Sequence, residues 1–312
     1  MYGILNEISS LPLAFGGASI SGEGAGYGFG QMSEGDALSL LNYAHDRGVK
    51  IFDTAPIYGF GLSEKRIGKA FKNKREDVFI VSKSGVTWHE NMRVDMTNDP
   101  IVTQKMLEQS LRDLESDYID LYMIHWPDER VDIRKPLEVL AKAKMEGKIK
   151  AIGLCNTHID DFNKASEIEK IEAIQSQLNF FERDVTKDIL PLVVEQEISF
   201  MSWGTLDKGI LTGRVHRDRT FDKSDCRSWA PWWKAMDKES RYKVMDKINP
   251  ILKDHGYTGL DLALSFNLAT EGCSTLLCGA RNHDQLDGIL NSLERPLTAE
   301  LLAKIDKVAS ES

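Results

Sequence analysis

The stretch Lys50-Ile51-Phe52-Asp53 is a short hydrophobic run that ends in an acidic residue, and Tyr58 follows shortly after it. Two later stretches have the same form: Val78-Phe79-Ile80-Val81-Ser82-Lys83 ends in a lysine, and Ile119-Asp120-Leu121-Tyr122-Met123-Ile124-His125 ends in a histidine. Runs of β-branched and aromatic residues of this length, bounded by helical stretches, are typical of buried parallel strands. In a (β/α) barrel the C-terminal ends of the strands form the floor of the active site. The three stretches therefore predict one pocket on which four side chains converge: Asp53, Tyr58, Lys83 and His125.

The rest of the chain alternates in the same way between strands and helices. Predicted strands cover residues 11–16, 50–53, 78–83, 119–125, 149–154, 171–177, 198–203 and 275–278. Amphipathic helical stretches are predicted at residues 34–47, 63–71, 102–114, 134–146, 160–168, 186–196, 240–255, 260–269 and 284–293. Strands that alternate with helices in this number favour a closed parallel (β/α)8 TIM barrel over an open doubly wound sheet. No linker rich in Pro, Gly or Ser divides the chain, so we expect one domain over residues 1–312.

The composition is that of a soluble globular protein, with 42% hydrophobic and 28% charged residues. The net charge of −9 argues against a nucleic-acid-binding groove and against binding to an anionic membrane surface. No apolar run is long enough to span a bilayer, and the N-terminus has no basic stretch followed by a hydrophobic core. The cysteines show no CxxC pair, which is typical of reduced thiols in a cytoplasmic protein. The histidines show no metal-ligand spacing, so we predict no metal site.

Two irregular segments interrupt the alternation, at residues 19–30 and 214–233. The first contains Gly22-Glu23-Gly24-Ala25-Gly26, which resembles the start of a dinucleotide-binding GxGxxG motif. That motif requires the glycines to lead directly from a strand into a helix, whereas here several more residues precede Glu34. We therefore expect a flexible first βα loop, with a Rossmann-type motif as the alternative. The second segment carries three tryptophans and is either a packed loop anchor or a lid over the pocket.

Three motifs in this order resemble those of the aldo-keto reductase superfamily, and the resemblance covers essentially the whole chain. Gly48-Val49-Lys50-Ile51-Phe52-Asp53-Thr54-Ala55-Pro56-Ile57-Tyr58-Gly59 is similar to the family's first signature. Val81-Ser82-Lys83 resembles its lysine motif, and Tyr118-Ile119-Asp120-Leu121-Tyr122-Met123-Ile124-His125-Trp126-Pro127-Asp128 resembles its histidine motif. The resemblance implies an alcohol-dehydrogenase-type oxidoreductase on a (β/α)8 barrel, with a nicotinamide cofactor.

The residue types fit the roles that carbonyl reduction requires. The cofactor supplies the hydride, and the protein supplies orientation, electrostatics and a proton. A free tyrosine has a pKa of about 10, and a neighbouring ammonium lowers this pKa by favouring the phenolate. We therefore expect Lys83 to bring the pKa of Tyr58 towards the working range, so that Tyr58 acts as the general acid. Asp53 would keep Lys83 charged and oriented, and His125 would donate a hydrogen bond to the substrate oxygen.

The second half of the chain resembles the family's nicotinamide site, with one departure. Gly153-Leu154-Cys155-Asn156 is similar to a GxSN strand end, which together with Gln175 would bind the carboxamide. Cys155 stands in place of the usual serine, and a thiol is a weaker hydrogen-bonding group than a hydroxyl. Trp203 matches the aromatic residue that stacks on the nicotinamide ring.

The resemblance also implies contacts with the cofactor's phosphates. The loop after the seventh strand would wrap the pyrophosphate, through Gly204, Thr205, Leu206, Lys208 and Arg214. Residues 276–285 resemble the adenosine-phosphate motif, with candidate contacts from Gly279, Arg281 and Gln285. Arg281 would bind a 2′-phosphate, because a guanidinium suits phosphate geometry. This favours NADP(H) over NAD(H), the alternative being that Arg281 is a solvated residue at the start of a helix.

Two tryptophans would form an apolar wall for the substrate, Trp88 in the loop after Lys83 and Trp126 directly after His125. The sequence thus predicts a cytoplasmic NADP(H)-dependent reductase of small-molecule aldehydes or ketones, sugar-type carbonyls included. The alternative is a cofactor-binding regulatory or scaffold protein on the same fold, since fold does not fix function. A pure scaffold need not retain all four polar groups of the pocket, which favours the enzyme.

Overall fold

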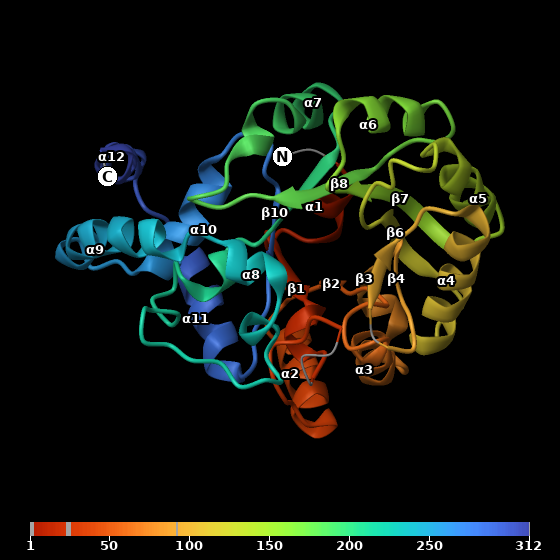
Figure 1. Ribbon diagram of the computed structural model, residues 1–312, viewed down its shortest axis with the longest axis horizontal. Helices are drawn as coiled ribbons and strands as arrows, with labels where there is room; N and C mark the ends of the chain where they lie inside the picture. The colour runs from red at the N-terminus through yellow and green to blue at the C-terminus, as the bar shows by residue number, and fades with distance from the viewer. Residues whose placement is uncertain (1–2, 23–25, 92, 312) are drawn as a thin grey trace.

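Parallel strands close into a barrel in the computed structural model, which describes residues 3–22, 26–91 and 93–311 (Figure 1). The strands are β1 (Leu13–Gly16), β2 (Ile51–Asp53), β3 (Phe79–Ser84), β6 (Ile119–Ile124), β7 (Ile149–Cys155), β8 (Ala173–Gln177), β9 (Ser199–Trp203) and β10 (Thr275–Cys278). Each pairs with its predecessor in this order, and β10 pairs with β1, where Ala14 lies opposite Leu277. All eight predicted strands are present, and the predicted (β/α)8 barrel is confirmed.

Helices form the outer layer of the barrel, and all nine predicted helical stretches are present. They are α2 (Glu34–Asp46), α3 (Leu62–Phe71), α4 (Pro100–Asp113), α5 (Arg134–Met145), α6 (Ile159–Ser166), α7 (Ile189–Glu195), α9 (Lys238–Asp254), α10 (Gly259–Ala269) and α11 (His283–Leu293). Side-chain caps fix several starts: Ser33 accepts from the Asp36 N–H before α2, and Thr258 and Asp261 form a capping box before α10.

Several elements of the fold were not predicted. They are α1 (Ile4–Ile8), the hairpin of β4 (Val86–Trp88) and β5 (Val94–Met96), α8 (Pro231–Ala235) and α12 (Ala299–Ser310). Most are too short to show a hydrophobic period. The exception is α12, which begins with a Thr298 cap and buries Leu301 and Ile305, a helical pattern that the sequence does contain.

Side chains on each strand alternate between the barrel interior and the helix layer. On β3, Val81 packs inside the barrel and Ile80 packs in the helix layer. Leu5 of α1 joins the interior cluster beside Ile51 and Phe79, the first residues of their strands. The Leu5 N–H also donates to Ser199 Oγ at 3.0 Å. The short α1 therefore fills the N-terminal end of the barrel.

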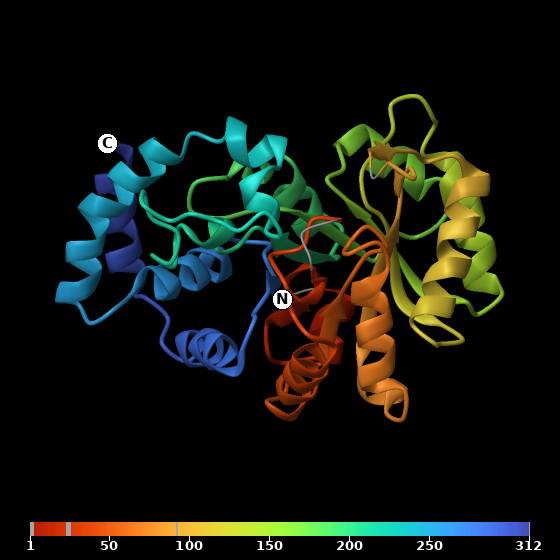
Figure 2. The ribbon, with the colours of Figure 1, turned by 60° about the horizontal axis from the view of Figure 1, so that its bottom comes forward.

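A second hydrophobic cluster lies beside the barrel, formed by α9, α10, α12 and the segment after β9. Figure 2 shows these helices, in blue, set apart from the red and orange strands and helices of the N-terminal part. Trp233 is 7% exposed and joins this cluster, whereas Trp229 is 37% exposed. Val215, Cys226 and Ala230 are buried in the same cluster, so the segment 214–233 is anchored at several points along its length.

The two irregular segments lie against each other. Phe29 forms an antiparallel bridge with Asp225, and the Cys226 N–H donates to the Gly28 carbonyl at 2.9 Å. We call this contact between residues 26–31 and 222–229 the loop clasp. The strand β1 leads into a short 3-10 turn at Gly17–Ile20 rather than into a helix, so the Rossmann alternative is wrong. Residues 23–25 of that motif lie outside the described residues.

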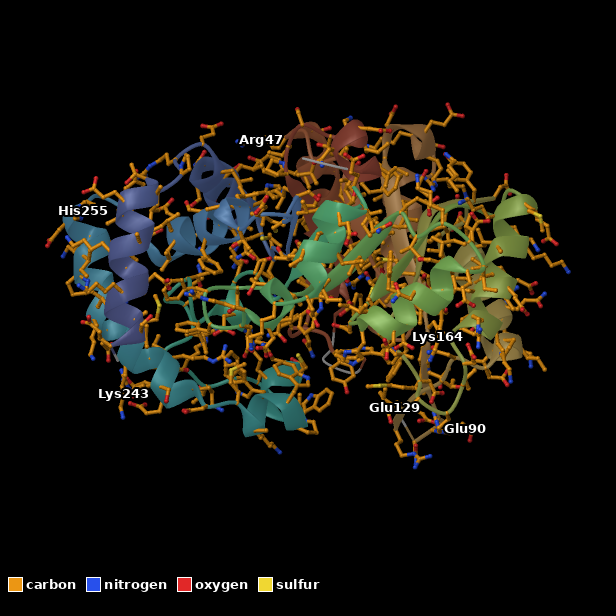
Figure 3. All side chains as sticks on the ribbon, turned by 90° about the horizontal axis from the view of Figure 1, so that it is seen from above. Arg47, Glu90, Glu129, Lys164, Lys243 and His255 are labelled. Atoms are coloured by element: carbon orange, nitrogen blue, oxygen red, sulfur yellow. The ribbon has the colours of Figure 1, made fainter. Side chains whose placement is uncertain are left out.

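Charged side chains surround the outside of the molecule, as Arg47, Lys164 and Lys243 illustrate in Figure 3. Glu90, between β4 and β5, and Glu129, after β6, project from the same end of the molecule. Within the described part of the chain, no helix is both long and apolar enough to cross a membrane. All four cysteines are buried, free thiols.

Candidate active site

The alternation of side chains along the strands brings the predicted catalytic residues together. Lys83 lies two residues after Val81, whose side chain faces the barrel interior. Asp53 on β2 and His125 directly after β6 likewise lie two residues after an interior-facing residue of their strands. Because α1 occupies the N-terminal end of the barrel, these polar groups meet at the C-terminal end.

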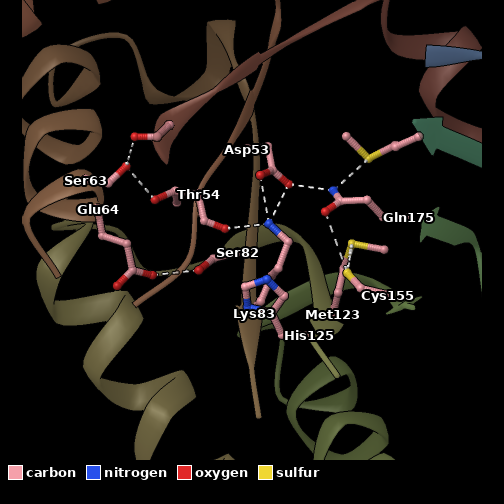
Figure 4. A network of polar contacts seen from close by, with 12 residues as sticks. Asp53, Thr54, Ser63, Glu64, Ser82, Lys83, Met123, His125, Cys155 and Gln175 are labelled. Carbon is pink, nitrogen blue, oxygen red and sulfur yellow. Dashed lines mark hydrogen bonds and ion pairs between the residues drawn. The ribbon is translucent and has the colours of Figure 1, made fainter. Parts of the chain in front are cut away.

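Lys83 is fully buried and is held by Asp53. Its Nζ donates to both carboxylate oxygens of Asp53 at 2.7 Å and to the Thr54 carbonyl at 2.9 Å (Figure 4). Burial by itself lowers the pKa of an ammonium, but the charge of Asp53 more than offsets this and raises the pKa of Lys83. Asp53 therefore holds Lys83 charged and oriented.

Tyr58 lies beside both Lys83 and His125. Lys83 Nζ is 5.4 Å from the centroid of the Tyr58 ring, and the rings of Tyr58 and His125 meet edge to face with centroids 5.9 Å apart. Burial raises the pKa of Tyr58 to about 12, although Lys83 opposes the rise. The expectation that this pKa moves towards neutrality is wrong, because desolvation of the phenolate outweighs its attraction to the ammonium. Tyr58 is thus protonated at neutral pH, as a proton donor must be.

His125 is a neutral imidazole at physiological pH. Burial, together with the charge of Lys83, lowers the pKa of His125 well below its ordinary value. Its backbone is fixed from two sides: its N–H donates to the Ser84 carbonyl at 2.8 Å, and Asn156 Nδ2 donates to its carbonyl at 3.0 Å. A neutral ring keeps one N–H that can donate to a substrate oxygen.

The three predicted carboxamide-binding residues are already engaged by protein groups. Gln175 Nε2 donates to Asp53 Oδ2 at 2.8 Å, and Cys155 Sγ lies 3.8 Å from Gln175 Oε1. Burial raises the pKa of Cys155, so its sulfur stays a thiol. Asn156 Oδ1 accepts from the indole N–H of Trp203 at 2.9 Å, and this contact fixes the indole ring.

A cavity of about 1650 Å3 opens beside these groups. Most of the predicted site residues line it, namely Tyr58, His125, Trp126, Asn156, Gln175, Trp203, Gly204, Thr205, Leu206, Lys208, Arg214, Gly279, Arg281 and Gln285. Asp53, Lys83 and Cys155 are buried and do not line the cavity. These three residues can act on a ligand only through their neighbours.

Trp88 does not line the cavity, so its predicted place in the substrate wall is wrong. It lies on β4, where it packs against the Phe60 ring with centroids 4.9 Å apart and remains 36% exposed. Val86 and Trp88 share one face of β4, but Val86 lines the cavity and Trp88, at the end of the strand, lies further out towards solvent.

Lys208 enters the cavity from a strained turn that the sequence did not reveal. Asp207 and Lys208 have φ angles of 46° and 56°, in the left-handed region that non-glycine residues rarely adopt. Arg241 holds the turn by donating to Asp207 at 2.5 Å and also to Glu182. Burial lowers the pKa of Lys208, and the charge of Asp207 opposes this. The three partners are distant in sequence, so no local pattern predicts the cluster.

Arg281 is neither solvated nor free. It donates to the carbonyls of Phe29 and Gly30, the second at 3.1 Å, and to that of Gln31 at 2.6 Å. Burial lowers the pKa of Arg281, with Asp225 opposing. The alternative of a merely solvated residue is therefore wrong: Arg281 ties the loop clasp to the cavity wall.

Glu64 is a buried carboxyl behind the site that was also not predicted. Figure 4 shows it next to Ser82, whose hydroxyl donates to Glu64 Oε1 at 2.6 Å. Its other oxygen has no hydrogen-bond partner among the described residues, and burial raises the pKa of Glu64 to about 7. The signal was present in the sequence, because Glu64 shares a helix face with the buried Ile67 and Phe71.

Comparisons with known proteins give one consistent family. The model of the aldo/keto reductase family matches residues 12–310. The aldo-keto reductase YhdN of Bacillus subtilis is 32% identical over 264 residues, which cover 84% of this chain and 80% of that protein. An NADH-specific methylglyoxal reductase of Escherichia coli is 29% identical over 273 residues, with 82% of each chain covered. The structure of a glycerol dehydrogenase of Gluconobacter oxydans superimposes with a TM-score of 0.84 at 31% identity, covering 96% of this chain and 91% of that one.

Among the residues that the structure describes, no group of three or more His, Cys, Asp or Glu side chains is arranged to hold a metal ion. The barrel, the buried lysine–aspartate pair beside a tyrosine and a histidine, and the family match over nearly the whole chain agree with one another. The chain belongs to the aldo/keto reductase family and is an oxidoreductase that acts on carbonyl compounds.

Proposed function

We propose that the protein is an NADP(H)-dependent reductase that converts an aldehyde or ketone to the alcohol, with Tyr58 as the general acid. The observation that carries this proposal is the contact between Tyr58, Lys83 and His125 at the wall of the large cavity. A proton donor, a cation and a neutral imidazole are the groups that a developing alkoxide requires.

Each polar group has one task in the reaction. A nicotinamide cofactor, when bound, would supply the hydride for the carbonyl carbon. Tyr58 donates its phenolic proton to the carbonyl oxygen, and the ammonium of Lys83 stabilises the phenolate that remains. His125 donates a hydrogen bond to the same oxygen and thereby orients the substrate. Asp53 keeps Lys83 in position, since both carboxylate oxygens accept from it.

The cavity fits a long anionic cofactor. Trp203 presents an indole ring that Asn156 holds in one orientation, beside the carboxamide-binding candidates. Further along the wall, Arg214, Arg219 and Lys223 line the cavity and form no salt bridge with any described carboxylate. Cations left unpaired in this way suit pyrophosphate and phosphate groups. The candidates for holding the cofactor are Cys155, Asn156, Gln175, Trp203, Gly204, Thr205, Leu206, Lys208, Arg214, Gly279, Arg281 and Gln285.

A preference for NADP(H) rests on the cations near Arg281. A Cβ on Gly30 would lie 3.7 Å from Arg281 Nη1 and 3.8 Å from Ser224 Oγ, so Arg281 and Ser224 flank the same part of the wall, and Lys223, the residue before Ser224, also lines the cavity. Two cations there suit an additional phosphate. The Escherichia coli relative is NADH-specific, which makes NAD(H) the alternative cofactor.

The assay that tests the function follows the absorbance of reduced cofactor. Purified protein should consume NADPH in the presence of a reactive aldehyde and should consume none without it. Dissociation constants for NADPH and NADH, measured by tryptophan fluorescence, should favour NADPH. Cofactor binding without consumption over a broad panel of aldehydes and ketones would instead indicate the regulatory or scaffold alternative.

A further inference from the structure

One end of the cavity is apolar. Around Tyr58 and His125 its wall is formed by Ile57, Val86, Val94, Met96 and Trp126. Ile57 and Val86 belong to a small hydrophobic cluster against which the side chains of Tyr58, Val94 and Trp126 pack. The reacting carbonyl therefore meets two polar groups, while the rest of its molecule meets hydrocarbon and indole.

The apolar surface continues outwards as a rim. Tyr27 packs on Trp229 with ring centroids 5.6 Å apart, and Phe60 packs on Trp88. Met96 is 44% exposed, and Trp88 and Trp229 are more than one third exposed. Of these exposed side chains, Met96 lines the cavity, and the two tryptophans lie outside its lining.

The wall is rigid. The Thr97 N–H donates to the Gly85 carbonyl at 3.0 Å, which joins the two ends of the β4–β5 hairpin, and Asn98 Nδ2 donates to the Trp126 carbonyl at 3.1 Å, which ties the hairpin to the segment after β6. Gly85 has a φ of +97°, and a Cβ there would lie 2.8 Å from Asn98 Oδ1. A preformed wall costs no ordering entropy when a ligand binds.

The charged groups of the hairpin face away from the cavity. Asp95 pairs with Arg130 at 3.8 Å, and neither residue lines the cavity. The amide of Asn156, which also lines the cavity, is bound to the His125 carbonyl and to Trp203. Hydroxyl groups of a substrate that lie against Ile57, Val86, Val94 and Met96 would meet no polar side chain of this wall, which costs free energy.

We propose that the substrate is an apolar aldehyde or ketone, medium-chain aliphatic or aromatic, rather than a polyol or a sugar. This inference rests on the proposed reductase function and narrows its substrate class. This substrate class would differ from those of two relatives, the glycerol dehydrogenase and the methylglyoxal reductase.

The test compares kcat/KM for propanal, butanal, pentanal and hexanal with that for glyceraldehyde. Burial of each methylene is worth about 0.8 kcal/mol, or about fourfold. We expect hexanal to exceed propanal by more than about tenfold, and glyceraldehyde to fall below propanal. A flat or falling series, or glyceraldehyde at the level of hexanal, would overturn the inference.

Two variants test whether the preference for longer aldehydes arises from this part of the cavity wall. Met96→Ser should reduce the advantage of hexanal over propanal, because it removes apolar wall beside the aldehyde tail. Met145→Ser is the matched control, since Met145 is 81% exposed on α5 and does not line the cavity. Melting temperatures close to that of the parent protein would show that both variants fold. If the ratio of kcat/KM for hexanal to that for propanal is the same in the parent protein and in both variants, the assignment of Met96 to the substrate wall is wrong.

A binding measurement separates this inference from the proposed function. Calorimetry with the unreactive amides hexanamide and propanamide should show tighter binding of hexanamide and a negative heat-capacity change. If no carbonyl compound is reduced, the proposed function fails, and the amides alone decide the inference. Equal affinity for the two amides would overturn it in either case.

Discussion

Tyr58 is the residue on which the proposed chemistry depends most. Tyr58→Phe removes only the hydroxyl, so we expect nearly unchanged affinity for NADPH and a kcat at least about a hundredfold lower, the usual range for loss of a general acid. Steady-state kinetics and fluorescence titration measure the two quantities. Tyr118→Phe serves as the control, because Tyr118 lies just before β6 at the opposite end of the barrel. Turnover near that of the parent protein would remove Tyr58 from the acid role.

Arg281 has two possible effects on binding, which the two cofactors distinguish. If its guanidinium binds the 2′-phosphate, Arg281→Ala removes a charge-assisted contact worth about 1.5–3 kcal/mol, so the NADPH dissociation constant should rise about tenfold to a hundredfold. The constant for NADH should stay nearly the same. Arg295→Ala is the control, since Arg295 does not line the cavity. An equal loss for both cofactors would show that Arg281 acts only by tethering residues 29–31.

Glu64 should make the stability of the protein depend on pH. Its pKa is about 7 in the folded protein, above the ordinary value of 4.5, so the folded state binds more protons between these two pH values. The free energy of unfolding therefore falls as pH rises from about 4.5 to 7 and stays reduced above pH 7. Glu64→Gln should remove this fall and stabilise the protein above pH 7 by up to about 3 kcal/mol.

Urea unfolding at pH 5 and pH 8 measures this effect. Glutamine can still accept from Ser82, and its amide can donate to the hydroxyls of Ser110 and Tyr122, which have no partner among the described residues. Glu90→Gln, at the turn between β4 and β5, is the control and should leave the pH dependence unchanged. If the free energy of unfolding falls between pH 5 and pH 8 by the same amount in Glu64→Gln as in the parent protein, Glu64 is not the cause of this fall.

At the scale of elements, the loop clasp holds residues 222–229 against residues 26–31. Arg214, Arg219 and Lys223 are exposed cleavage sites for trypsin in the segment after β9. If this segment closes over the cofactor, NADPH should slow cleavage at these sites and leave cleavage after the exposed Lys72, beyond α3, unchanged. Arg281→Ala should accelerate cleavage without cofactor, because it releases the clasp. Equal cleavage with and without NADPH would identify the segment as a fixed wall.

The elements differ in how far the sequence predicts them. The strands were predictable because each is a run of β-branched and aromatic residues, and the catalytic positions followed from where each run ends. The hairpin of β4 and β5 was not, because strands of three residues carry no period, and so Trp88 was expected in a loop against the substrate rather than at the outer end of a strand. The partners of Asn156 and Arg281 lie on distant elements, and only the folded chain brings them together.

At the scale of the whole molecule, the barrel was predictable and the balance of charge and burial inside it was not. The number and order of the predicted strands imply a closed barrel, and this inference does not depend on the environment of any single side chain. The pKa of Tyr58 instead depends on how much water the assembled structure removes from the phenol, and this outweighs the one ammonium that the sequence identified. Motifs therefore identify the reacting groups, whereas their protonation states follow from packing.

The pairing of β1 with β10 has a consequence for biosynthesis. A ribosome synthesises the chain from the N-terminus, so Ala14 of β1 can pair with Leu277 of β10 only after Leu277 has been made. This pairing closes the barrel. Until residues 275–278 leave the exit tunnel, the nascent sheet is open and exposes the edges of β1 and β9 to other chains. Contacts of such long sequence separation also form slowly. Closure of the barrel therefore waits for its last strand, and the edges of β1 and β9 stay unpaired until β10 has been made.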